Sequence, residues 1–259
     1  MQGAFPSVDK KNAPKFFFKA SLPVRLSRSL TNPFVKQEAI FSPITILEMK
    51  NLNSVLAAAA FFLFCITTSN AQLTFGIKAG LNLANINYDG EDLDTKMLPS
   101  FHAGPIVEFG ITENIGIGSG LIVSGKGFKI EEEFLGETFT AKSNPIYLQV
   151  PVTLNYSNSG FFAAVGPYVG FGLFGNSTAE GGGEKESDAL KFGSTEDDDF
   201  SALDFGGSLE VGYGFGAFRV TASYALGLAN IIPKDYADEF DEKATNNVIG
   251  ISAAYLFGK

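Results

Sequence analysis

The stretch Ile146-Tyr-Leu-Gln-Val-Pro-Val-Thr-Leu-Asn-Tyr156 decides the fold class. Every even-numbered position in it is apolar or aromatic, whereas the odd-numbered positions hold Tyr147, Gln149, Pro151, Thr153 and Asn155. Apolar side chains at every second residue lie on one face of a β-strand, while a helix would repeat them every three or four residues. The stretch therefore predicts a strand with one apolar face.

The same period of two recurs through the chain after Gln72. It is strong at 101–111, 203–215 and 219–228, and weaker at 75–87, 115–130, 161–175 and 248–257. Together with 146–156 these segments make eight predicted strands. Several exceed the roughly 5–6 residues of a typical strand and approach the roughly 9–11 that a tilted strand needs to cross a bilayer.

The connectors between the predicted strands alternate in length. Long polar connectors fall at 88–98, 131–142, 176–199 and 231–244, and short ones at 112–114, 157–160 and 216–217. Long loops at one end and tight turns at the other are typical of bacterial outer-membrane barrels, whose short turns face the periplasm. We therefore predict an all-β fold, an eight-stranded antiparallel up-and-down transmembrane β-barrel, over residues 72–259.

The residue types on the less apolar face favour a barrel over a soluble sandwich. That face is rich in glycine and carries single charges, Lys78, Glu108, Lys126, Asp204, Glu210 and Arg219. Small or mutually paired side chains suit a narrow lumen, and a closed barrel leaves no unpaired strand edge in hydrocarbon. Aromatic residues near the short turns predict a girdle at the membrane interface: Tyr156, Phe161, Tyr213, Phe215 and Phe218.

The first 71 residues are predicted to lie outside the barrel. From Met49 a lysine, an apolar run and small residues up to Ala71 follow the plan of a secretory signal peptide, 49–71, too short in its apolar part to span a bilayer. Residues 1–48 are basic and show neither strand nor helix periodicity, so we expect them to be a translated leader that results from a wrongly assigned start codon. The alternative is a basic cytoplasmic arm or a long n-region of the signal peptide. Cys65 follows Leu-Phe, which argues against lipidation.

Three segments resemble the PorT-type outer-membrane β-barrel proteins of Bacteroidetes, a porin-like family. They are Phe75-Gly-Ile-Lys-Ala-Gly-Leu-Asn-Leu-Ala-Asn85, the proline-containing strand from Tyr147 to Tyr156, and Gly166-Pro-Tyr-Val-Gly170. The resemblance implies an eight-stranded outer-membrane barrel and no particular catalytic residue. The chain departs from many barrels at its end, because Gly258-Lys259 follow Phe257, and this puts recognition by the barrel-assembly machinery through that end in doubt.

Composition excludes several kinds of site. Residues 72–259 hold eleven Lys/Arg against twenty-five Asp/Glu, a formal charge of −14, so no nucleic-acid partner is expected. The chain has one cysteine and one histidine, His102, which without partners makes no catalytic triad. The acidic stretch 179–200 matches no calcium loop and is expected to be solvated and mobile, and Gly181-Gly182-Gly183 lacks the lysine of a phosphate loop. We predict no catalytic, cofactor or metal site and no enzyme activity.

The predicted function is a structural or interaction protein of the outer membrane that displays acidic extracellular loops. Its expected partners are outer-membrane lipid, the barrel-assembly machinery and a protein that docks on the loops. The alternatives are a transport or protein-secretion component, as the PorT-type resemblance implies, and a soluble lipocalin-like ligand carrier. A lumen about wide enough for its own side chains argues against an open pore.

Overall fold

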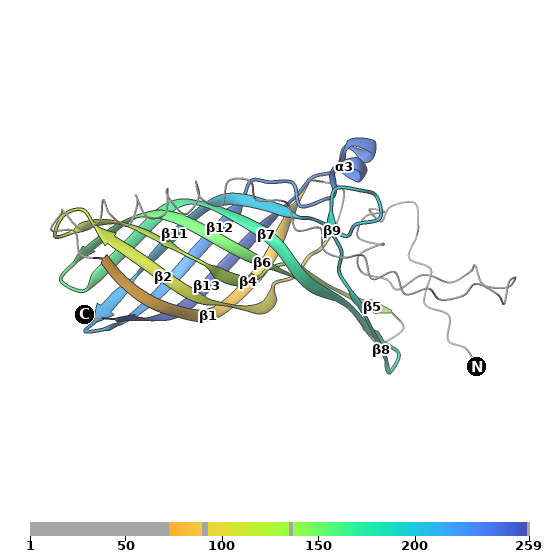
Figure 1. Ribbon diagram of the computed structural model, residues 1–259. Helices are drawn as coiled ribbons and strands as arrows, with labels where there is room; N and C mark the ends of the chain where they lie inside the picture. The colour runs from red at the N-terminus through yellow and green to blue at the C-terminus, as the bar shows by residue number, and fades with distance from the viewer. Residues whose placement is uncertain (1–72, 90–92, 135–136, 258–259) are drawn as a thin grey trace, which may run out of the picture. The chain divides into compact units, whose positions relative to one another are not determined.

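The computed structural model describes residues 73–89, 93–134 and 137–257 (Figure 1). No helix within these ranges is long and apolar enough to cross a membrane. The elements, in chain order, are β1 (Leu73–Tyr88), β2 (Leu98–Gly110), β3 (Ile115–Gly120), β4 (Ile122–Gly125), β5 (Phe128–Phe134), β6 (Glu137–Asn158), β7 (Phe161–Gly181), β8 (Glu184–Ala189), β9 (Phe192–Gly193), β10 (Phe200–Ser201), β11 (Leu203–Phe215), β12 (Phe218–Gly227), α3 (Lys234–Phe240) and β13 (Ala244–Phe257).

The strands close into a ring through antiparallel pairing. β1 pairs with β2 on one side and β13 on the other, and the order continues from β13 through β12, β11 and β7 to β6. β3, β4 and β5 follow one another along β6, and β3 and β4 also pair with β2, so the three share one position. Within the described residues the ring has eight positions, which confirms the predicted antiparallel barrel.

The apolar side chains face outward. On β1, Leu81 is 72 % exposed and the next residue, Asn82, is 3 % exposed. The same alternation continues along β11, β12 and β13, where outward residues are exposed and inward ones are half-buried or buried. The predicted orientation is confirmed, and it is the reverse of a soluble carrier, which would keep its apolar face inside.

The predicted third strand, 115–130, is broken twice in the structure. Leu121 interrupts it between β3 and β4, where its N–H donates to the Pro105 carbonyl. Lys126 and Gly127 separate β4 from β5, and Gly127 has a φ of 105°. A Cβ at Gly127 would overlap the Ser143 carbonyl oxygen, so only glycine suits this position.

Two of the predicted long loops form β-structure instead. Residues 131–142 belong largely to the β5–β6 hairpin, and residues 176–189 continue β7 and return as β8. The result is a four-stranded sheet in the order β5-β6-β7-β8 that extends past the long-loop end of the ring (Figure 1). We call this extension the projecting sheet: residues 128–134, 137–144, 175–181 and 184–189.

The opposite end carries the short turns and exposed aromatic residues. The turns lie at 111–114, 159–160 and 216–217, as predicted. Tyr156 packs on Phe161 and Phe215 on Phe218, with ring centroids 6.4 and 6.5 Å apart. Tyr255 joins the cluster 5.1 Å from Phe218. The aromatic residues proposed as a girdle therefore lie outward at one end of the barrel. The predicted leader, 1–48, and signal peptide, 49–71, lie outside the described residues.

Candidate functional site

The six charged residues predicted for the inner face form three ion pairs across the lumen. Lys78 of β1 pairs with Glu210 of β11. Arg219 of β12 binds Glu108 of β2 through both guanidinium nitrogens, with 2.9 Å between Nη2 and Oε2, and its guanidinium carbon lies 3.7 Å from the centre of the Phe162 ring. The forked contact is the strongest geometry that a carboxylate and a guanidinium adopt.

The third pair, Lys126 with Asp204, is the most deeply buried. Nζ and Oδ2 are 2.6 Å apart, and the two side chains are 1 % and 0 % exposed. Tyr168 and Asn246 also donate to Oδ2, at 3.4 and 3.1 Å, and Nζ lies 4.2 Å from the centre of the Tyr168 ring. A lysine and an aspartate buried this completely need such partners, because each is expensive to remove from water.

An apolar plug covers the lumen beyond this pair, at the long-loop end. Its buried members are Ile86, Phe128, Leu190, Phe200, Ile231, Ile232, Tyr236 and Ala244. Burial raises the pKa of the Tyr236 phenol. The plug combines strand residues from β1, β5 and β13 with residues of the connectors around β9, β10 and α3. Phe192 extends these contacts to β6, because the centre of its aromatic ring lies 5.5 Å from that of Tyr147.

Two of the acidic loop residues stabilise residues 190–200, which contribute Leu190 and Phe200 to the plug and which we call the plug segment. Asp198 accepts from the backbone N–H and hydroxyl of Thr195, at 2.9 and 2.7 Å. Asp199 accepts from the N–H of Lys191 at 2.8 Å. Leu190 and Phe200 are buried, so this part of 179–200 packs against the barrel, although its carboxylates remain on the solvent side.

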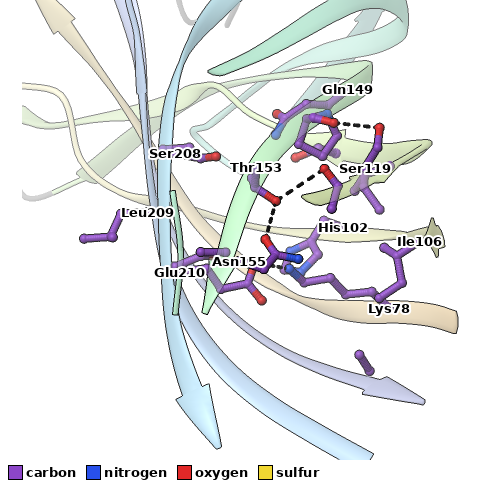
Figure 2. Close-up of a pocket in the computed structure, with 18 of the residues that line it drawn as sticks. Lys78, His102, Ile106, Ser119, Gln149, Thr153, Asn155, Ser208, Leu209 and Glu210 are labelled. Carbon is purple, nitrogen blue, oxygen red and sulfur yellow. Dashed lines mark hydrogen bonds and ion pairs between the residues drawn. The ribbon is translucent and has the colours of Figure 1, made fainter. Parts of the chain in front are cut away.

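On the other side of the Lys126–Asp204 pair the lumen contains a cavity of about 120 Å³. Figure 2 shows Gln149, Thr153 and Asn155 of β6 in this cavity, with His102 of β2 and Lys78 nearby. Polar side chains from strands around the ring line the cavity together with apolar ones such as Ile106, Ile122 and Phe162. No three His, Cys, Asp or Glu side chains in the described part of the chain gather as a metal site would require.

The hydrogen bonds of His102 fix its tautomer. The Asn82 amide nitrogen donates to Ser124 Oγ and to the carbonyls of Phe101 and Gly125, so its Oδ1 is an acceptor. His102 Nδ1 lies 2.7 Å from that oxygen and must therefore carry the hydrogen. Nε2 is left with an acceptor lone pair. The sequence placed His102 on the inner face, but Asn82 as its orienting partner was missed.

One face of the projecting sheet holds ion pairs. Lys96 and Lys129 bind Glu131 at 2.9 and 2.8 Å, and Lys185 and Lys142 bind Glu180 at 2.6 and 3.5 Å. Hydrogen bonds from the lysines lower the pKa of Glu131 from 4.5 to about 2 and also lower the pKa of Glu180. Each of these two glutamates is therefore neutralised by a pair of lysines.

The other face carries a row of carboxylates on the edge strand β8. Glu184, Glu186 and Asp188 alternate with Lys185 and Ser187, so the three share one face. All six residues of β8 are exposed, and within the described ranges none of the three carboxylates has an ion-pair partner. The alternation in 184–188 was visible in the sequence, but without apolar residues it gave no strand signal.

The chain is similar to one protein family and to several solved structures. Residues 68–233 match the family model described as outer membrane protein beta-barrel domain. No curated protein matches the chain. Similar solved structures include Ail, the attachment invasion locus protein of Yersinia pestis, in complex with the heparin analogue sucrose octasulfate (14 % identity, 72 % of this chain and 99 % of that chain, TM-score 0.40). Others are Neisserial surface protein A (9 %, 72 % and 99 %, 0.35) and OprG from Pseudomonas aeruginosa (15 %, 72 % and 96 %, 0.31).

Proposed function

The chain belongs to the outer membrane protein beta-barrel domain family and is an outer-membrane protein, and on this basis we propose that it is an interaction protein that binds a cationic, extended segment of a partner along β8. The long-loop end faces outward in this proposal, and the outward apolar band contacts lipid. The observation that carries it is the exposed edge strand with three unpaired carboxylates on one face. The proposal involves no catalysed reaction.

The backbone of β8 supports strand addition. Gly182 and Gly183 form a two-residue turn with φ values of 59° and 82°, as in a type I′ hairpin. In such a hairpin the flanking pair Gly181–Glu184 exchanges hydrogen bonds, and so does every second pair after it. The peptide groups of Lys185 and Ser187 therefore point away from β7 and offer donors and acceptors to an added strand.

The side chains of β8 select the partner's charge. Residues two apart on a strand are separated by about 6.6 Å, and an added strand has the same spacing. A segment with lysine or arginine at every second position therefore places its cations opposite Glu184, Glu186 and Asp188. An acidic row also discourages association between copies of the same edge.

Transport or protein secretion, which the PorT-type resemblance suggests, is the second candidate. It requires a passage, and the apolar plug and the Lys126–Asp204 pair fill the lumen at the long-loop end. These contacts favour an interaction role over an open pore. They leave room for a secretion role in which the partner binds outside the lumen.

The binding proposal is tested with a fluorescent peptide that alternates lysine and threonine, added to the purified barrel in detergent micelles. Neutralising the row by Glu184→Gln, Glu186→Gln and Asp188→Asn is expected to weaken binding about tenfold, at about 0.5 kcal/mol for each exposed charge pair. Ser187→Pro is expected to weaken it further, since proline removes an outward donor while an edge strand tolerates it.

The control removes the same charge elsewhere: Asp235→Asn, Glu239→Gln and Asp241→Asn, in and just after α3. It is expected to leave peptide affinity within about twofold of the wild type, because these carboxylates lie off β8. If both triple variants weaken binding equally, the peptide responds to net charge alone and the proposal is wrong. If the wild type does not bind, the acidic row serves only to keep the edge unpaired.

A further inference from the structure

We propose that the lumen cavity is a binding site for a small, neutral, polyhydroxylated molecule that enters from the short-turn end. The cavity volume, about 120 Å³, corresponds to about ten water molecules at 10–15 Å³ each. A linear sugar alcohol of about twelve non-hydrogen atoms is of that size. This site is separate from β8 and does not depend on the interaction proposed there.

The ligand is neutral because the charged groups around the cavity already neutralise one another. Lys78 pairs with Glu210, Arg219 with Glu108, and Lys126 with Asp204. A charged ligand would have to compete with these contacts and lose its own hydration in a narrow lumen, which is costly without a new partner. A neutral ligand leaves all three pairs in place.

The free hydrogen-bonding capacity of the lining belongs to uncharged groups. Asn155 accepts from Thr153 at 2.7 Å through Oδ1, which leaves its amide N–H groups for a ligand. Among the described residues, no side chain or backbone group binds the Gln149 amide, and His102 Nε2 keeps its acceptor lone pair. The lining therefore offers both donors and acceptors, among them Gln149, Asn155 and His102 (Figure 2), and hydroxyl groups, which both donate and accept, match it.

The direction of entry follows from what lies at each end. The apolar plug and the buried Lys126–Asp204 pair close the long-loop side. Toward the short turns, Gly214 faces inward on β11, and a Cβ there would meet only backbone oxygens 3.6 and 3.8 Å away. This position has space for a side chain beside the Arg219–Glu108 pair that lines the cavity, which makes the short-turn side the proposed route of entry.

The test uses sorbitol, with gluconate and glucamine as analogues of similar length that carry a negative and a positive charge. The barrel in micelles is titrated with each compound, and the side-chain amide signals of Gln149 and Asn155 are followed by NMR. Sorbitol is expected to give saturable shifts with a Kd of about 1–10 mM, typical of about twelve weakly bound atoms. The charged analogues are expected to bind at least about tenfold more weakly.

Two glycines of β11 give a matched pair of variants. Gly214→Trp places a large side chain in the entrance and is expected to abolish the shifts. Gly207→Trp places the same side chain on the outer face, where a Cβ meets nothing within 4 Å, and is expected to leave them unchanged. Gln149→Leu removes a binding group and is expected to raise the Kd about threefold to tenfold.

Three results would overturn the proposal. Shifts that grow linearly without saturation would mean that the cavity holds water only. Equal binding of all three compounds would mean that charge is not selected. Binding that survives both Gly214→Trp and Gln149→Leu would place the sorbitol elsewhere on the protein. Heat-shifted gel mobility confirms in each case that the variant is a closed barrel.

Discussion

Lys126, directly after β4, and Asp204, near the start of β11, face each other across the barrel with Nζ and Oδ2 2.6 Å apart and almost no exposure to solvent. The residues are far apart in the sequence but occupy the same level of the lumen, just below the apolar plug. Their contact joins strands on different sides of the barrel, so at this level the lumen is filled by packed side chains.

Breaking this pair on one side is expected to destabilise the barrel strongly. Asp204→Leu leaves a buried ammonium without a counter-charge and is expected to cost about 3–5 kcal/mol, whereas Lys126→Met combined with Asp204→Leu is expected to recover most of that loss. Denaturant unfolding in micelles, followed by the heat-shifted gel band, measures both. A double variant as unstable as the single one would show that the site tolerates no apolar filling.

The plug is expected to keep the barrel closed to ions. In planar bilayers the wild-type protein should show no openings of nanosiemens size, because the lumen narrows to packed side chains. Phe192→Ala with Phe200→Ala removes two rings that pack 6.4 Å apart in the plug segment and should produce frequent openings. Large steady conductance in the wild type would contradict both the packed lumen and the preference for an interaction role.

Two glycines with positive φ are expected to differ in their sensitivity to alanine. Gly216→Ala should lower the free energy of unfolding by about 1–2 kcal/mol, because alanine is strained in the left-handed conformation even with open space around it. Gly127→Ala should cost about 3 kcal/mol or more, because its Cβ also overlaps the Ser143 carbonyl. Unfolding experiments on the two variants give the comparison, and equal losses would mean that the chain between β4 and β5 shifts easily.

The pKa of Glu131 is expected to depend on Lys96. The folded-state pKa, about 2, lies below the ordinary 4.5, so the favourable contacts of this carboxylate are complete above pH 4.5 and are lost as the pH falls toward 2. Lys96→Met should move the pKa upward, with Lys129 still bound. NMR titration of the Glu131 carboxyl measures the change, and Lys234→Met, at the first residue of α3, is the control that should leave it unaltered.

The barrel could be predicted because its signal is local. Alternation in 146–156 and 203–215 places each side chain inside or outside without knowledge of any neighbour, and the order of short and long connectors sets the antiparallel topology. The same alternation identified the six charged lumen residues. It gave no information on which residue pairs with which, because partners such as Lys78 and Glu210 meet only through the register of strands far apart in the chain.

The projecting sheet and the plug escaped prediction for opposite reasons. β8 has no apolar residue to reveal its period, so its strand character depends on pairing with β7. The plug residues Ile231 and Ile232 are apolar but lie between strands, in a stretch whose polar composition indicated a loop. The helix α3 was missed because seven residues between two turns are too short for a recognisable repeat.

The pairing of β1 with β13 gives the molecule a particular order of assembly. Fourteen residues of the first strand lie opposite fourteen of the last, so the seam joins the two ends of the sheet. Until β13 is delivered, β1 and β12 each keep a row of unsatisfied peptide groups that hydrocarbon cannot accept. A partly assembled sheet can therefore enter hydrocarbon only where something else covers these two edges until the seam closes.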